Sequence, residues 1–119
     1  MTIPLKNASD LCTARTQVRL VCSSGCVGED RTDAAVLVLS ELAGNAVQHG
    51  LPPVQYTTAI DRDDVLVTVE DGASLLPLQR AAAAGAADES GRGLFLVASL
   101  SRSWGWTVTA GGKQVWARI

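Results

Sequence analysis

The chain lacks the features of a membrane-spanning, secreted or nucleic-acid-binding protein. No apolar run in its 119 residues approaches the roughly 20 residues needed to cross a bilayer. Its first residues lack the basic-then-apolar layout of a signal peptide. Its ten lysines and arginines are scattered and its net charge is −2, whereas a nucleic-acid surface typically carries a basic stripe. We therefore expect a cytoplasmic protein with no direct contact to nucleic acid or membrane.

Metal-ligating side chains are also few. The chain has three cysteines, Cys12, Cys22 and Cys26, and a single histidine. A structural zinc site needs a fourth ligand at short spacing, which this set does not supply. We expect the cysteines to be small buried hydrophobic side chains. A redox switch between Cys22 and Cys26 is the alternative.

The composition that remains is that of an ordinary globular domain. Hydrophobic residues make up 47% of the chain and charged residues 18%, which fits a folded protein and not a disordered one. A chain of 119 residues can bury one core but not two. We expect a single domain over residues 1–119.

Hydrophobic periodicity predicts both helices and strands. Helices are expected at residues 9–22, capped by Ser9 and Asp10, and at residues 31–48 and 94–100. Strands are expected in two hairpins, at residues 54–61 with 65–71 and at residues 104–109 with 114–119. The alanine-rich residues 73–90 are either a mobile lid or a short packed helix. This order predicts an α+β protein, a two-layer α/β sandwich whose mixed, mostly antiparallel sheet is covered on one face by helices.

The second predicted helix carries a row of polar side chains. Glu41, Asn45 and His49 are spaced four residues apart, so on a helix they lie along one face, each about 6 Å further along the axis. The rest of the segment is strongly apolar, and a carboxylate and an amide on a largely buried helix need partners. We interpret the row as functional and expect it to end at Gly50 in a left-handed cap. A solvated polar stripe is the alternative.

Two further segments can close around the same ligand. Asp71 shares a strand face with three valines, so it emerges on the core side, where a carboxylate is costly unless it binds something. The Gly91-Arg92-Gly93 turn feeds a helix N-terminus, which suits a phosphate chain. The amide oxygen of Asn45 can take part in holding Mg²⁺, and a carboxylate one helical turn away can accept a proton from an attacking hydroxyl.

Together these motifs resemble those of the GHKL (Bergerat-fold) ATPase superfamily, and within it the small anti-sigma factors that are serine-protein kinases. Residues 39–50 resemble the N-box of that family, residues 67–73 its first glycine box and residues 90–97 its second. Trp104-Gly105 and residues 112–116 resemble its closing hairpin. The resemblance covers nearly the whole chain and implies ATP and Mg²⁺ as cofactors.

The resemblance also implies a role for each matching residue. Glu41 would be the general base and Asn45 the Mg²⁺ ligand, while Asp71 would bond the adenine amino group. The backbone from Gly91 to Leu94 would cradle the phosphates. The cofactor-binding set implied in this way consists of Asn45, His49, Asp71, Ala73, Gly91, Arg92, Gly93, Leu94 and Gln114.

A few positions depart from the family pattern. Ala73 and Leu75 stand where the first glycine box has glycines, and Gln114 replaces a common threonine that helps to hold adenine. Glu89 stands where some kinases of this type have an arginine, and Arg92 is the candidate substitute. The metal and base positions are therefore intact, while the lid and adenine positions are altered.

Two functions follow from the resemblance. The first is an ATP-binding regulator that phosphorylates a serine of an antagonist protein and sequesters a sigma factor, as a monomer or a homodimer. The second is a catalytically impaired binding module of the same fold that regulates transcription by sequestering a partner protein. The ATPase half of a two-component histidine kinase is disfavoured, because the single histidine, His49, belongs to the N-box.

Overall fold

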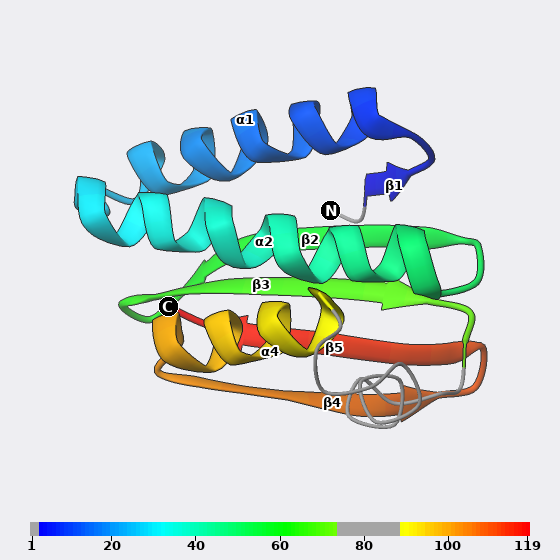
Figure 1. The fold of residues 1–119 in the computed structure, drawn as a ribbon. Helices are drawn as coiled ribbons and strands as arrows, with labels where there is room; N and C mark the ends of the chain where they lie inside the picture. Colours follow the sequence, from blue (N-terminus) through cyan, green and yellow to red (C-terminus); the bar gives the residue numbers. More distant parts are fainter. Residues whose placement is uncertain (1–2, 74–88) are drawn as a thin grey trace.

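The computed structural model describes residues 3–73 and 89–119, which form one sheet and the helices that cover it (Figure 1). The strands are β1 (Ile3–Leu5), β2 (Val54–Asp61), β3 (Asp64–Asp71), β4 (Ser103–Thr109) and β5 (Gly112–Arg118). The helices are α1 (Ala8–Ser24), α2 (Glu29–His49) and α4 (Glu89–Leu100). The predicted lid or short helix falls on residues 74–88, which lie outside the described residues.

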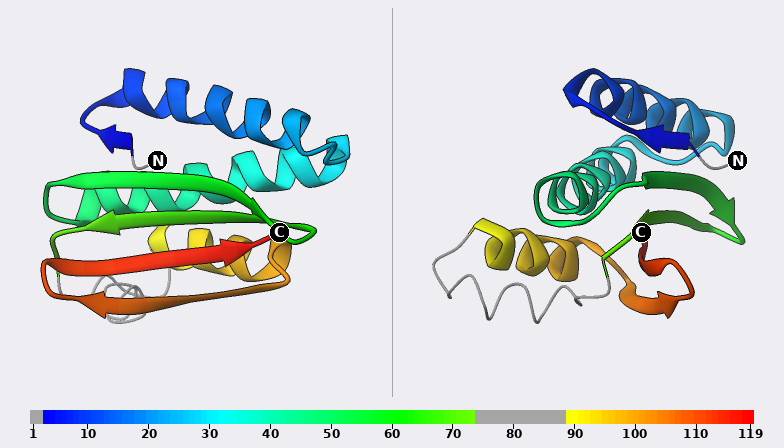
Figure 2. Two further views of the ribbon diagram at one scale, coloured as in Figure 1. Left: turned by 180° about the vertical axis from the view of Figure 1, so that it is seen from behind. Right: turned by 90° about the vertical axis from the view of Figure 1, so that its right-hand side faces the viewer.

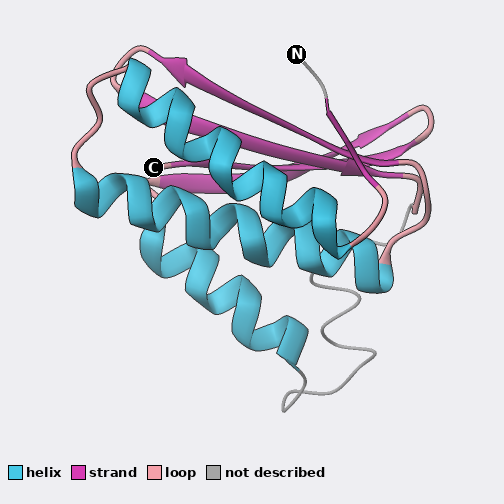
Figure 3. Cartoon of the chain, turned by 90° about the horizontal axis from the view of Figure 1, so that it is seen from above, coloured by secondary structure: helices cyan, strands magenta, loops and turns pink. Residues whose placement is uncertain are grey.

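The sheet has the strand order β1-β2-β3-β5-β4, and each neighbouring pair is antiparallel. The described helices all lie on one face of this sheet (Figure 2 and Figure 3). α2 contacts both α1 and α4 as well as β3 beneath it. The predicted two-layer α+β sandwich is confirmed. Its described strands pair only in the antiparallel sense, so the sheet is not mixed.

Strand alternation determines which side chains of the sheet reach the helices. Along β3, Val65, Val67 and Val69 are buried, as a period of two residues predicts. They pack in one core with apolar side chains of the three helices, among them Val18, Val38, Leu39, Leu42 and Val97. Asp71 continues the same alternation and is only 7% exposed. The strand thus delivers a carboxylate to the core face, as predicted.

The ends of two helices differ from the sequence prediction. The cap of α1 is Asn7, whose Oδ1 accepts a hydrogen bond from the Asp10 N–H at 3.1 Å. Gly50 follows α2 with φ −85° and ψ −173°, which is extended backbone, so the predicted left-handed cap is wrong. Packing is what requires a glycine here, because a Cβ at Gly50 would lie 2.7 Å from Cγ of Asp71.

The cysteines behave as predicted at one position. Cys22 is buried, but Cys12 and Cys26 are exposed, and all three are free thiols. Among residues 3–73 and 89–119, no cluster of three or more histidine, cysteine or acidic side chains could hold a metal ion. Within the same ranges, no helix has both the length and the apolar composition to span a bilayer.

Candidate functional site

Glu41 and Asn45 lie on the face of α2 that meets α4. A Cβ added to Gly93 would lie 2.6 Å from Oε2 of Glu41 and 3.6 Å from Nδ2 of Asn45. Gly93 is buried, while Glu41 and Asn45 are half-buried. The two helices approach this closely because residue 93 has no side chain. The structure therefore brings together the predicted base, the predicted metal ligand and one residue of the predicted phosphate segment.

The glycine segment belongs to α4 itself. The helix begins at Glu89, so the expectation of a glycine turn before a helix at residue 94 is wrong. The N-cap and the first three residues of a helix have N–H groups without a partner within it, and among the described residues of α4 these are Glu89, Ser90 and Gly91. The backbone N–H of Gly91 can therefore still bind an anion, whereas the N–H groups of Arg92, Gly93 and Leu94 fall within the helical hydrogen bonding. The side chain of Arg92 is outside the described part of the structure.

Asp71 forms a buried ion pair with Lys113. The two residues are paired across β3 and β5, so their side chains lie on the same face of the sheet. Nζ of Lys113 lies 2.9 Å from Oδ1 and 2.9 Å from Oδ2 of Asp71. The side chain of Lys113 is 0% exposed and that of Asp71 is 3% exposed. Oδ1 of Asp71 also accepts a hydrogen bond from the N–H of Ala73 at 2.7 Å.

Two glycines pack tightly against Asp71, Gly50 against its side chain and Gly112 against its backbone. A Cβ at Gly50 would lie 2.8 Å from Oδ2 of Asp71. Gly112 has φ +153°, and a Cβ there would collide with the carbonyl oxygen of Asp71. A positive φ of this kind is readily adopted by glycine alone. The backbone turns on both sides of Asp71 therefore depend on glycine.

A small cavity connects the Asp71 end of the site with the Asn45 end. Its volume is about 10 Å³, and it is lined by Leu42, Asn45, Ala46, Val69, Asp71, Leu94 and Val115. That is room for about one water molecule, whereas small-molecule pockets typically measure about 300–1,000 Å³. Leu94, one of the predicted cofactor-binding residues, is 6% exposed and helps to close this space.

Two other predicted site residues lie elsewhere. Gln114 lies next to Lys113 in β5 and therefore on the opposite face of the sheet, where its Nε2 donates to Oε1 of Glu70 at 2.7 Å. Gln114, which the resemblance places in the cofactor-binding set, therefore does not lie beside Asp71 on the helix-covered face. His49 is the last residue of α2 and is exposed. Glu41 and Asn45 thus keep partly buried positions along the predicted row, and His49 does not.

Lys113 was not predicted from the sequence. The last strand was expected to begin at residue 114, which assigned Lys113 to the turn, whereas β5 begins at Gly112. Because the strand begins two residues earlier, Lys113 shares a face with buried Val115 and Ala117. The two-residue spacing of Lys113, Val115 and Ala117 was the sequence pattern that could have indicated a buried lysine.

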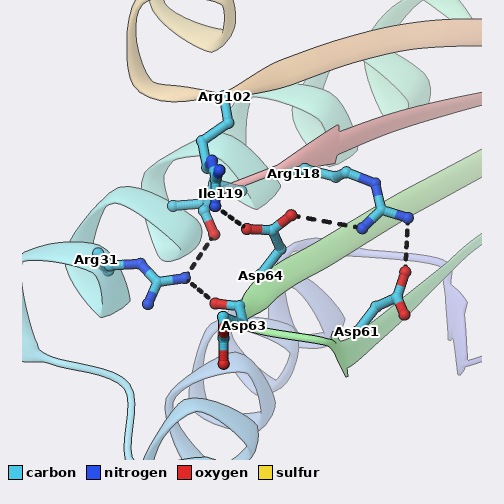
Figure 4. Close-up of polar contacts among 7 residues, drawn as sticks. All are labelled: Arg31, Asp61, Asp63, Asp64, Arg102, Arg118 and Ile119. Atoms are coloured by element: carbon cyan, nitrogen blue, oxygen red, sulfur yellow. Dashed lines mark hydrogen bonds and ion pairs between the residues drawn. The ribbon is translucent and has the colours of Figure 1, made fainter.

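The opposite end of β3 carries a partly exposed network of ion pairs (Figure 4). Arg118 contacts Asp61 at 2.6 Å, and Arg102 contacts Asp64 at 2.6 Å. The hydrogen bond to Asp61 is the chief reason that the pKa of Arg118 is raised. Arg31 of α2 donates to the carbonyl oxygen of Ile119 at 2.9 Å. These contacts join the adjacent ends of β2 and β3 to β5, to the residue before β4 and to α2, and ion pairs open to solvent contribute little to stability.

The sequence matches the histidine kinase-like ATPase domain family over residues 4–119. The chain therefore belongs to this family, whose domains bind ATP. No curated protein matches the chain.

The residues present fit ATP and Mg²⁺ at one end of the site. Asn45 offers an amide oxygen for a metal, and the free N–H groups at the start of α4 suit phosphate oxygens. At the other end the fit fails, because the ammonium of Lys113 already binds both oxygens of Asp71. The side chain of Asn45 and the start of α4 are therefore chemically suited to Mg²⁺ and phosphates, whereas the carboxylate expected to hold adenine is already bound by Lys113.

Proposed function

We propose that this chain is an ATP-dependent regulator of the anti-sigma-factor type, which phosphorylates a serine of an antagonist protein and sequesters a sigma factor. One observation carries the kinase part of the proposal, namely the position of Glu41 and Asn45 beside Gly93 at the start of α4. A base, a metal ligand and an anion-binding helix start at one place are the parts that phosphoryl transfer needs.

Each residue has a distinct task in this proposal. The carboxylate of Glu41 accepts the proton of the serine hydroxyl as that oxygen becomes the nucleophile. The amide oxygen of Asn45 would hold Mg²⁺, and the N–H group of Gly91 would orient the phosphates. Bound ATP would supply the phosphoryl group to be transferred. The absence of a side chain at Gly93 allows the carboxylate of Glu41 to lie against the backbone of α4.

The protein partners follow from the resemblance of the motifs to those of small anti-sigma factors. On that ground we propose a sigma factor and its antagonist as partners, with a homodimer as a further possibility to be measured. The domain consists of one sheet with helices on one face, and such a domain must use its surface to recognise both proteins.

A second function is favoured by the ion pair between Asp71 and Lys113. If the closed base pocket prevents nucleotide binding altogether, the domain would regulate transcription by sequestering its partner without catalysis. The two functions differ in a measurable way, because only the first requires Glu41.

Phosphoryl transfer from labelled ATP to purified candidate antagonists tests the proposal. Glu41→Gln should lower the rate by about 10²–10⁴, the contribution typical of a general base, while nucleotide affinity stays unchanged. Glu29→Gln is the matched control, because Glu29 is an exposed glutamate in the first turn of the same helix. A wild-type protein that binds a sigma factor but phosphorylates no antagonist would favour sequestration without catalysis.

A further inference from the structure

Lys113 occupies the hydrogen-bonding position that the family resemblance gives to the adenine amino group. We propose that Lys113 is the specificity-determining residue of this site and abolishes selection of adenine, so that a nucleotide is held by its triphosphate and not by its base. This inference rests on the proposed function in one respect, because it assumes that the phosphate end binds a triphosphate.

The ammonium of Lys113 uses its donors on two residues. It has three N–H donors, and its nitrogen lies 2.9 Å from each oxygen of Asp71 and 3.4 Å from the carbonyl oxygen of Ala73. The N–H of Ala73 contributes another hydrogen bond to Oδ1 of Asp71. The carboxylate is thus neutralised and hydrogen-bonded by residues of the chain itself, and needs no ligand.

An adenine amino group is a poor replacement for this lysine. It is neutral, so displacing the ammonium would leave the charge of Asp71 uncompensated at a position where its side chain is 3% exposed. An uncompensated buried charge is strongly unfavourable. The displaced ammonium, which is now 0% exposed, would also need a route to water.

The packing around Asp71 also leaves little space for a nucleotide base. The cavity that Asp71 shares with Asn45 measures about 10 Å³, and Gly50 packs against the carboxylate, since a Cβ there would lie 2.8 Å from Oδ2. Gly93 of α4 lies beside Glu41 and Asn45 of α2, and no hydrogen bond of Lys113 involves Glu41 or the N–H groups of α4. Triphosphate binding can therefore persist without base recognition.

The experiment uses probes that separate the two ends of the site. Adenosine reports on the base pocket alone, and magnesium tripolyphosphate reports on the phosphate end alone. Both are titrated by NMR against wild type, Lys113→Thr and Lys113→Arg, with the Ala73 amide signal as the readout for the base pocket. Lys113→Arg is the matched control, because it keeps a cation against Asp71. ATP and GTP affinities are measured on the same proteins, and circular dichroism checks the fold of each.

We expect no adenosine binding by wild type or Lys113→Arg. For each of these proteins, the dissociation constants for ATP and GTP should agree within about threefold. Lys113→Thr should bind adenosine and prefer ATP over GTP by about tenfold or more, the value of one hydrogen bond to a charged group. Adenosine binding by wild type, or a tenfold preference of wild type for ATP, would overturn the inference. So would a folded Lys113→Thr that ignores adenosine.

Failure of the proposed function has a different signature. If no variant binds magnesium tripolyphosphate or a nucleoside triphosphate, the phosphate end is not a site, whereas the adenosine titrations still report on Lys113. If Lys113→Thr does not fold, the wild-type adenosine titration decides the inference by itself: no shift of the Ala73 amide supports it, and a saturating shift overturns it.

Discussion

Replacing Lys113 with methionine removes one partner of a buried ion pair while keeping a long side chain in the core. The carboxylate of Asp71 would then retain the hydrogen bond from the Ala73 N–H and lose its contacts to the ammonium. Removing one partner of a buried pair typically costs about 3–5 kcal/mol, because the remaining charge is uncompensated. Set against a typical domain stability of about 5–15 kcal/mol, such a loss is readily measured.

Urea unfolding followed by tryptophan fluorescence measures this loss. The double variant Asp71→Asn/Lys113→Met should recover most of the stability, since it removes both charges and keeps an acceptor for the Ala73 N–H. Arg19→Met is the surface control, because it breaks an ion pair with Asp33 whose side chains are 54% and 60% exposed. That change should cost less than about 1 kcal/mol. A loss below about 1 kcal/mol for Lys113→Met, equal to the surface control, would refute the burial of the Asp71–Lys113 pair in solution.

Three further predictions follow from the packing. Gly93→Ala should slow phosphoryl transfer while changing stability by less than about 1 kcal/mol, because the new Cβ would meet only the flexible end of Glu41, at 2.6 Å; unimpaired transfer would contradict the close approach of α4. Gly112→Ala should lower the free energy of unfolding by about 1–3 kcal/mol, because its Cβ would meet backbone at φ +153°, and a neutral effect would argue against that φ. Tyr56 has a buried hydroxyl with no hydrogen-bond partner among the described residues, so Tyr56→Phe should raise the free energy of unfolding by about 1 kcal/mol. Burial, with a smaller effect of Asp10, raises the pKa of Tyr56, so the unfolded chain loses this proton first. Wild type should therefore lose stability as the pH rises above about 10, and Tyr56→Phe should lack that part of the loss; parallel pH profiles would contradict this.

The sequence predicted the elements whose patterns are local and complete. The bounds of β2 agree with the prediction at both ends, and β3 differs by one residue, because β-branched residues and clean alternation mark both strands. β1 was missed, since a strand of three residues has too short a pattern to detect and depends on pairing with β2. The start of α4 was placed too late because glycines at residues 91 and 93 favour a turn locally, although the helix continues through them.

The parts of the candidate site that depend on local sequence patterns were predicted correctly. The proximity of Glu41 and Asn45 follows from helical spacing, and the burial of Asp71 from strand alternation. The role of Lys113 could not be found in the same way, because it depends on the register between β3 and β5. Register is a tertiary property, and an error of a residue or two at the start of β5 concealed the ion pair.

Calorimetric titration with ATP, with and without Mg²⁺, tests most directly whether a nucleotide binds between α2 and α4. Wild type should bind ATP in a Mg²⁺-dependent manner, and Asn45→Ala should weaken that binding by at least about tenfold, or about 1.4 kcal/mol. Gln48→Ala, at an exposed position of the same helix, should bind as wild type does. Equal affinity of wild type and Asn45→Ala for ATP in the presence of Mg²⁺, or no binding by wild type, would contradict a nucleotide site at this place.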